Sequence, residues 1–236
     1  MMILMGIFLT VAAYYIAKVL YSRKPVIGLS PLLVCPALLI FLLAYGNVSY
    51  QAYYEGAQWF TNMLQPATVA FAVPLYKHRS LIQAYALEIV VGVVGGSVIA
   101  LITSVAFSQW FQISPEMMGS MAPRSITTPL AMLVSQNIGG IPALTAVFVI
   151  LTGLTGILLG PLVVRYFSIK SEVSKGLLMG MGAHACGTSK AYEMGQMEGA
   201  VASLTMIFAG IITLLLAPLL VPKLAGILHS IPTAFG

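Results

Sequence analysis

The sequence has few charged residues, and one charged residue type is missing altogether. Only 7% of the 236 residues are charged, and the six acidic ones are all glutamates, so the chain contains no aspartate. This scarcity argues against a cation or proton antiporter, because such carriers hold their ion at carboxylates within the membrane. Only Glu88 and Glu193 are expected to lie at membrane depth, and they remain candidates for binding a coupling ion.

Cysteine is also scarce, and the basic residues are scattered. Cys35 and Cys186 lie far apart in apolar segments, which predicts neither a metal site nor a disulfide framework, and no cofactor is expected. The 11 basic residues, which give a net charge of +5, stand singly or in short groups at the ends of apolar runs. That placement is typical of membrane topology signals and contacts with lipid headgroups, and not of nucleic-acid binding.

Apolar residues are what the sequence has in excess. They make up 59% of the chain, and the mean hydropathy is +0.98, whereas soluble domains hold about 45–50% apolar residues. Long apolar runs without alternation predict helices, because lipid leaves backbone groups no other partner. The predicted fold is an all-α polytopic membrane protein, a single domain over residues 1–236, with about seven crossings. The clearest spans are expected at 1–20, 29–45, 81–107, 141–165 and 200–222.

The basic residues predict the orientation of the spans. Three cations between residues 18 and 24 place the first loop in the cytoplasm and the N-terminus outside. Arg165, Lys170 and Lys175 mark another cytoplasmic loop, so the chain must be on the outer side both before and after 112–140. That segment is therefore predicted to enter the membrane and return, as a re-entrant hairpin of two half-helices.

The stretch "MAPRSITTPL", residues 121–130, lies at the predicted turn of this hairpin. Thr128 is expected to cap the second half-helix, with Pro129 at its first position and Gly139–Gly140 after its end. Ten residues span about 15 Å, half the membrane, so the positive end of this half-helix lies near the midplane. Arg124, with no acidic residue nearer than Glu116, joins that end in a setting that suits an anion.

A second broken helix is predicted in segment 57–77. Pro66 is expected to begin a half-helix directly after Gln65. Aligning Pro66 with Pro129 matches polar residues of the two segments, which favours an internal repeat, although chance similarity in so restricted an alphabet is the alternative. The matched residues are Thr61, Asn62 and Gln65 in the first segment, and Arg124, Ser125 and Thr128 in the second.

Segment 172–199 predicts a third break. Gly180, Gly182 and Gly187 interrupt it, and Thr188 or Ser189 is expected to cap a new helix. Its ionisable residues are expected to be functional, because such side chains are costly at membrane depth. Two arrangements stay open: the segment crosses the membrane as a broken helix and leaves Lys223 in the cytoplasm, or it forms a second hairpin and places Lys223 outside.

Discontinuous helices with their ends at the midplane are typical of secondary transporters. The expected inverted repeats match 29–45, 57–77 and 81–107 with 141–165, 172–199 and 200–222. The broken segments 57–77, 112–140 and 172–199 would form a core that moves, elevator-like, against a peripheral scaffold or dimer helix at 1–20. The predicted substrate-binding residues are Arg124, Ser125, Thr127, Thr128, Asn62, Gln65, His184, Thr188, Ser189 and Lys190, and the coupling-ion candidates are His184, Glu193 and Glu88.

Two long runs, "MAPRSITTPLAMLVSQNIGGIPALTAVFVILTGLTGILLGP" and "GLLMGMGAHACGTSKAYEMGQMEGAVASLTMIFAGI", make the sequence resemble the LrgB/CidB membrane protein family over nearly its whole length. The resemblance implies a bacterial inner-membrane protein, often accompanied by a small LrgA/CidA-type membrane partner. Members were first described as holin- or antiholin-like regulators, a plant relative as a plastid glycolate/glycerate translocator, and some bacterial relatives are linked to pyruvate uptake. It thus implies a carrier of glycolate, glycerate, lactate or pyruvate. Apart from the resemblance, a homo-oligomer, namely a dimer, is the expected assembly.

Other interpretations remain beside the transporter. A holin- or antiholin-like regulator of murein hydrolases would need a helix with an amphipathic lining, and would not need half-helices. Arg124 can instead be a structural clamp on backbone carbonyls, and His184 a core histidine with its hydrogen bonds satisfied. An intramembrane hydrolase is disfavoured, because Ser189 and Lys190 are adjacent in sequence and do not face each other on a helix.

Overall fold

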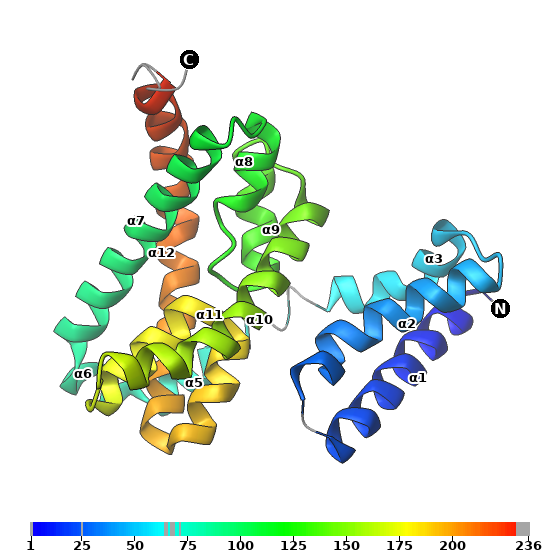
Figure 1. Ribbon diagram of the computed structural model, residues 1–236, viewed down its shortest axis with the longest axis horizontal. Helices are drawn as coiled ribbons and strands as arrows, with labels where there is room; N and C mark the ends of the chain where they lie inside the picture. Colours follow the sequence, from blue (N-terminus) through cyan, green and yellow to red (C-terminus); the bar gives the residue numbers. More distant parts are fainter. Residues whose placement is uncertain (1, 25, 64–65, 67–68, 71, 230–236) are drawn as a thin grey trace. The chain divides into compact units, whose positions relative to one another are not determined.

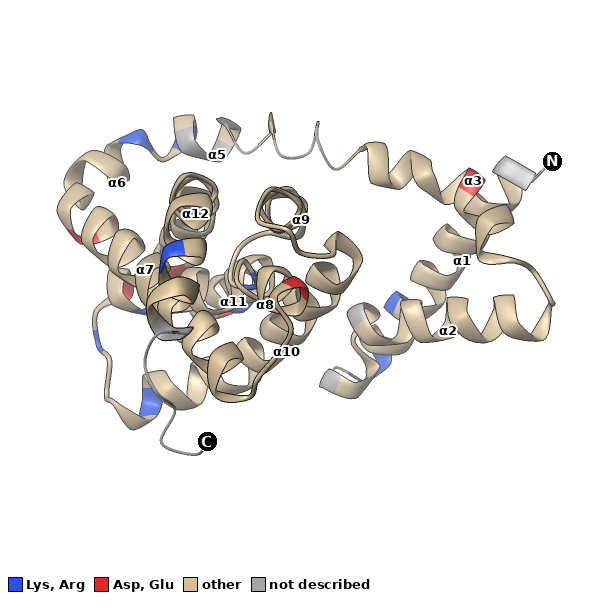
Figure 2. Cartoon of the chain, turned by 90° about the horizontal axis from the view of Figure 1, so that it is seen from above, with Lys and Arg blue, Asp and Glu red and all other residues tan. Residues whose placement is uncertain are grey.

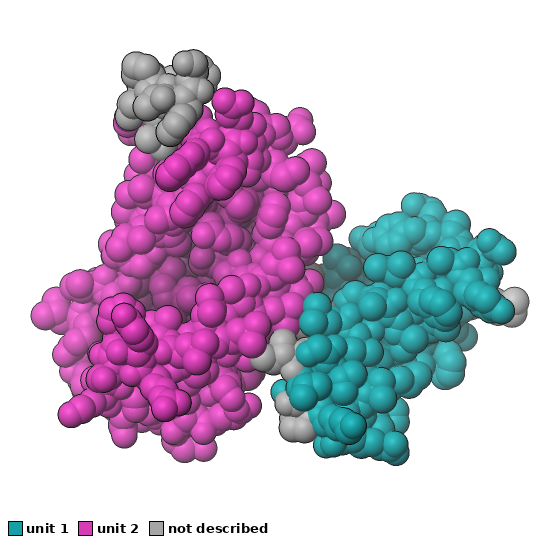
Figure 3. All heavy atoms as spheres, in the orientation of Figure 1, with its two compact units in different colours: residues 1–69 teal, residues 70–236 magenta. Residues whose placement is uncertain are grey.

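The computed structural model is helical throughout the residues that it describes, which are all except 1, 25, 64–65, 67–68, 71 and 230–236 (Figure 1). Within those residues it contains no strand. The chain forms two compact units, residues 1–69 and 70–236, and Figure 3 distinguishes them by colour. Each unit is described by itself.

The first unit is a small group of helices built around α1. It consists of α1 (Met2–Arg23), a 3-10 turn η1 (Ile27–Leu29), α2 (Pro31–Tyr45) and α3 (Tyr50–Asn62). Gly6 of α1 lies directly against the backbone of α3 at Tyr53 and Gly56, where a side chain would not fit. The hydroxyls of Thr10 and Tyr53 are 2.8 Å apart and join the same two helices. Polar contacts of this kind help to hold helices together in lipid.

The second unit carries the broken segments. Its helices are α5 (Ala72–Lys77), α6 (Arg79–Ala84), α7 (Ala86–Trp110), α8 (Pro115–Met121), α9 (Thr128–Asn137), α10 (Pro142–Tyr166), α11 (Glu172–Met194) and α12 (Gln196–His229). Figure 2 shows how few positions along these helices carry a charged residue.

Four helices in the described part of the chain are long and apolar enough to cross a membrane: Leu4–Arg23, Ala86–Trp110, Pro142–Tyr166 and Gln196–Ile227. They correspond to the predicted spans 1–20, 81–107, 141–165 and 200–222. The fifth predicted span, 29–45, falls on α2, whose 15 residues cover about 22 Å, short of the roughly 30 Å of a hydrocarbon core. The chain is an all-helical membrane protein, and the expected seven crossings remain a prediction.

The first hairpin, defined as residues 115–137, consists of α8, a turn at 122–127 and α9. At its base the backbone N–H of Ile141 donates to Ser120 Oγ over 2.7 Å, and Gly140 lies against the backbone of Gly119. The chain thus returns to α8 before α10 begins, as expected for a hairpin within 112–140. The predicted cap is wrong by one residue: Thr127 stands at the N-cap position of α9, without a capping bond from its side chain, and Pro129 is the second residue of the helix.

The second hairpin, defined as residues 172–194, is α11 itself. Ala183 and His184 are non-helical, and beyond them Gly187 lies back against the carbonyl of Met179. The arm before the break has Gly180 against Thr205, and the arm after it has Thr188 Oγ1 3.9 Å from Met206 Sδ, so both arms pack on the same part of α12. Of the two arrangements that the sequence leaves open, a broken crossing and a second hairpin, the structure has the second hairpin.

The break itself differs from the prediction. It lies at Ala183 and His184 and not at the glycines, and neither Thr188 nor Ser189 caps the second arm. Both hydroxyls instead donate to carbonyls four residues earlier, at His184 and Ala185. The glycines serve packing, because they let the arms approach their neighbours closely.

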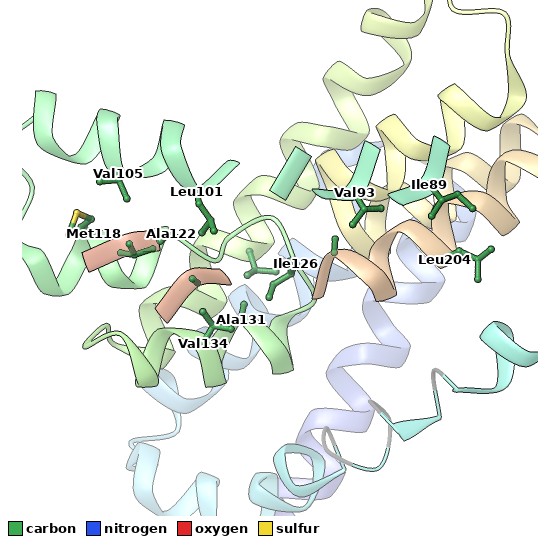
Figure 4. Packing of buried hydrophobic residues seen from close by; sticks show 14 residues of the cluster. Ile89, Val93, Leu101, Val105, Met118, Ala122, Ile126, Ala131, Val134 and Leu204 are labelled. Carbon is green, nitrogen blue, oxygen red and sulfur yellow. The ribbon is translucent and has the colours of Figure 1, made fainter. Parts of the chain in front are cut away.

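The two hairpins extend from opposite ends of α10 toward its middle. The first is fastened at the start of α10, where Thr145 Oγ1 donates to Ser135 Oγ over 2.7 Å. The tip of the second reaches the middle of α10, where Ala183 lies against Gly156. Ile126, at the tip of the first, belongs to an apolar cluster with residues of α7 and α12, labelled in Figure 4. Both tips thus lie inside the unit, away from its ends.

This arrangement predicts that positions 170 and 223 lie on opposite sides of the membrane. After the second hairpin returns, α12 is the next crossing, and Gln109 near the end of α7 contacts Ala225 near the end of α12. In a Cys35→Ser/Cys186→Ala background, an impermeant maleimide added outside should label Lys223→Cys, and label Lys170→Cys only after permeabilisation. Labelling of both from the same side would contradict the second hairpin.

Candidate functional site

The tips of both hairpins line one pocket of about 560 Å³ along α10. The first hairpin contributes Arg124 and the second contributes the backbone around its break. Leucines and other apolar side chains form most of the remaining wall. The polar, glycine or non-helical positions on it are Arg124, Thr152, Thr155, Gly156, Gly160, Gly182 and Ala183.

Arg124 is the charged group of this pocket. It is half-buried, and its Nη1 donates to Ser104 Oγ of α7. Ser104 is fully buried, and its own hydroxyl donates to the carbonyl of Ala100 over 2.6 Å. A guanidinium has five N–H donors, so this single bond leaves most of them available.

No carboxylate neutralises Arg124 in the part of the chain that the structure describes. The ion pairs found there join Lys175 with Glu198, at 3.4 Å, and Lys190 with Glu193. An unpaired cation away from water is costly, and a bound anion would remove that cost. The site is therefore suited to a ligand that brings its own negative charge.

The start of α9 adds a positive helix end beside Arg124. The first N–H groups of a helix have no partner within it, and their dipoles favour an anion. The cap residue Thr127 is 4% exposed, and its Oγ1 has no hydrogen-bond partner. The helix end and the arginine thus both carry positive charge, and both favour an anion.

His184 forms the tip of the second hairpin. Its φ of 40° and ψ of −126° are strained for a residue with a side chain. The imidazole is 4% exposed, and its Nε2 lies 2.9 Å from the carbonyl oxygen of Val149. Because a carbonyl only accepts, Nε2 carries the proton and donates. Gly153 makes room for the ring, since a Cβ there would lie 2.9 Å from His184 Cε1.

The structure brings some predicted residues together and separates others. Arg124 lines the pocket, and the neighbouring Ser125, Thr127 and Thr128 belong to the same hairpin tip. Asn62 ends α3 in the other unit, and its role at this pocket stays a prediction. Gln65 lies outside the described residues.

The polar residues of the second arm do not line the pocket. Thr188 and Ser189 donate to their own helix, and Lys190 is paired with Glu193 on the half-exposed side of the hairpin. Glu88 is exposed in the first turn of α7. The expectation that Glu88 lies at membrane depth stays a prediction, because the helix that carries it is a candidate span but begins only two residues earlier.

Three residues that the sequence analysis did not single out prove relevant. Thr152 and Thr155 face the pocket from α10, and Glu198 is a carboxylate only 5% exposed. The sequence could have indicated the two threonines, because they stand three residues apart and so share one face of an apolar helix. Glu198 had no such signal, because its burial depends on the fold of the second hairpin onto α12.

The fold and the site define a class: an all-helical membrane protein with two opposed helical hairpins and an arginine that, among the described residues, has no carboxylate partner. Within that class, the chain belongs to the LrgB-like family, whose model matches residues 10–223. This confirms the resemblance read from the two polar motifs.

Relatives of known sequence match this chain over almost their full length. YwbG of Bacillus subtilis (strain 168), an uncharacterized protein, is 49% identical over 92% of this chain and 96% of its own. The antiholin-like protein LrgB of the same organism is 34% identical over 94% and 96%. The antiholin-like protein LrgB of Bacillus cereus (strain B4264) is 34% identical over 92% and 95%. No solved structure matches the chain significantly.

The strained backbone at the tip predicts an unusual order of stabilities at position 184. His184→Ala and His184→Gly both lose the bond to Val149, but only glycine accepts a φ of 40° without strain. We expect His184→Ala to lower the free energy of unfolding by about 1 kcal/mol more than His184→Gly. Thermal unfolding of both variants in detergent measures this difference, and the reverse order would contradict the strained conformation.

Proposed function

We propose that this protein is a secondary transporter of small monocarboxylates such as glycolate, glycerate, lactate or pyruvate. One observation carries the proposal: Arg124 and the break of the second hairpin line the same pocket, and Arg124 has no carboxylate partner among the described residues. Paired broken helices around an anion site at depth are typical of such carriers. The substrate carboxylate would accept from Arg124 and from the N–H groups at the start of α9.

Several further features belong to the same proposal. Arg165, Lys170 and Lys175 stand around the start of the second hairpin, which favours a cytoplasmic position for that end in a bacterial inner membrane, with the N-terminus outside. A homodimer, a small LrgA/CidA-type partner and an elevator-like movement of the hairpins against helix 1–20 complete the expected assembly. The driving ion would be bound at His184, while exposed Glu88 and Glu193 are weaker candidates.

The arrangement of the second unit supports inverted repeats with new boundaries. α7 is followed by the first hairpin, and α10 by the second, which enters from the opposite end. This scheme replaces the earlier match of 29–45, 57–77 and 81–107 with 141–165, 172–199 and 200–222, because 172–194 returns to the end where it starts.

Uptake of labelled monocarboxylates into proteoliposomes tests the transporter, with this chain alone and with an LrgA-type partner. Arg124→Lys should lower uptake roughly 30- to several-thousand-fold, because removing a partner from a desolvated charge pair costs about 2–5 kcal/mol and lysine lacks the planar fork. Arg165→Lys, at the end of α10, is the matched control and should transport normally. Normal uptake by Arg124→Lys would make the arginine a structural clamp.

The names of two relatives favour a second candidate, an antiholin-like regulator of cell lysis. Vesicles loaded with carboxyfluorescein separate the two, since a hole-forming protein releases the dye and a carrier of small acids retains it. We expect retention, together with lactate or pyruvate uptake that saturates with concentration. Dye release without saturable uptake would favour the antiholin-like function.

A further inference from the structure

Thr152 has a hydroxyl group that its own helix does not use. It lies in the middle of α10 and lines the pocket with Arg124. In the described part of the chain its Oγ1 makes no hydrogen bond. Threonines in membrane helices usually donate to the carbonyl four residues earlier, and on the same helix Thr155 does so to Leu151 over 2.7 Å.

The position of Thr152 in the pocket is next to the break of the second hairpin. Its chain neighbour Gly153 lies against the imidazole of His184, and Val149, three residues earlier, accepts the His184 bond. Thr152 therefore lies where the second hairpin meets α10, while Arg124 belongs to the same pocket from the first hairpin. An unpaired hydroxyl in apolar surroundings is costly, and a polar ligand atom removes the cost.

We propose that Thr152 is a specificity-determining residue that recognises the oxygen on C2 of a 2-hydroxy or 2-oxo monocarboxylate. The inference rests on the proposed transport function and adds a residue to its site. In such acids the C2 oxygen stands beside the carboxylate, so a ligand held by Arg124 presents it to a second polar group in the pocket. Thr188 and Ser189 are unsuited to this role, because their hydroxyls donate to their own helix.

The apolar wall defines the other part of the ligand. Phe148 precedes Thr152 by one turn, and Leu151 and Leu159 flank the two threonines along the pocket. These side chains suit a methyl or short alkyl group and offer no donor to a third oxygen. The site thus favours lactate and pyruvate over glycerate, and all of these over propionate, which lacks the C2 oxygen.

Competition between lactate and propionate tests the role of Thr152. The two acids have the same carbon chain and differ only by the 2-hydroxyl group. In proteoliposomes we expect wild-type protein to prefer lactate, and Thr152→Val, which has the same shape without the hydroxyl, to lose about 3- to 10-fold of that preference. Propionate uptake should stay unchanged, which a merely structural defect would not produce.

Two further variants make the result specific. Thr155→Val is the matched control, because it removes a hydroxyl of the same pocket wall that already donates to Leu151, and it should keep the wild-type preference. Thr152→Ser, which keeps a hydroxyl, should show the preference for lactate that Thr152→Val loses. An unchanged preference in Thr152→Val, or an equal loss in Thr155→Val, overturns the role of Thr152. The proposed transport function still stands in that case, provided that the wild type takes up lactate. Absence of any monocarboxylate uptake by the wild type overturns both.

Discussion

A helix broken inside a membrane leaves backbone N–H and C=O groups that lipid cannot satisfy, and the second unit is organised around this constraint. The two breaks, at residues 122–127 and at Ala183–His184, do not lie at the ends of the unit but against α7, α10 and α12. Polar side chains complete the arrangement, with Ser104 accepting from Arg124 and Val149 accepting from His184. The same packing forms a mostly apolar pocket that holds one arginine.

Small residues make this burial possible. Gly156 lets the tip of the second hairpin approach α10, and Gly180 lets its first arm approach α12, at separations that a side chain would prevent. At the bases, ordinary polar contacts hold the hairpins: Ser120 with Ile141 for the first, and Lys175 with Glu198 for the second. The hairpins are thus fastened at their bases, while their tips line the pocket.

The chemistry of the pocket follows from what it contains and from what the chain lacks. A half-buried arginine and the unpaired hydroxyl of Thr152 belong to an otherwise mostly apolar pocket, α9 begins a few residues after the arginine, and the described carboxylates are engaged elsewhere or exposed. Such a site complements a small organic anion better than a metal or an inorganic cation. The antiholin-like names of relatives describe those proteins, and a carrier of central metabolites can influence cell lysis indirectly, so the two descriptions need not exclude each other.

The sequence by itself determined that the chain is a helical membrane protein, to which family it belongs, and where the first hairpin lies. These follow from local properties: apolar length, the prolines around Arg124 and the charges at span ends. Only the tertiary structure decided that 172–194 turns back, that the break falls on Ala183 and His184, and that Thr152 lines the pocket of Arg124 while Thr188 and Ser189 do not. The direction of a chain after a break, and the face a hydroxyl presents, depend on which helices pack beside it, and single-sequence spacing does not contain that information.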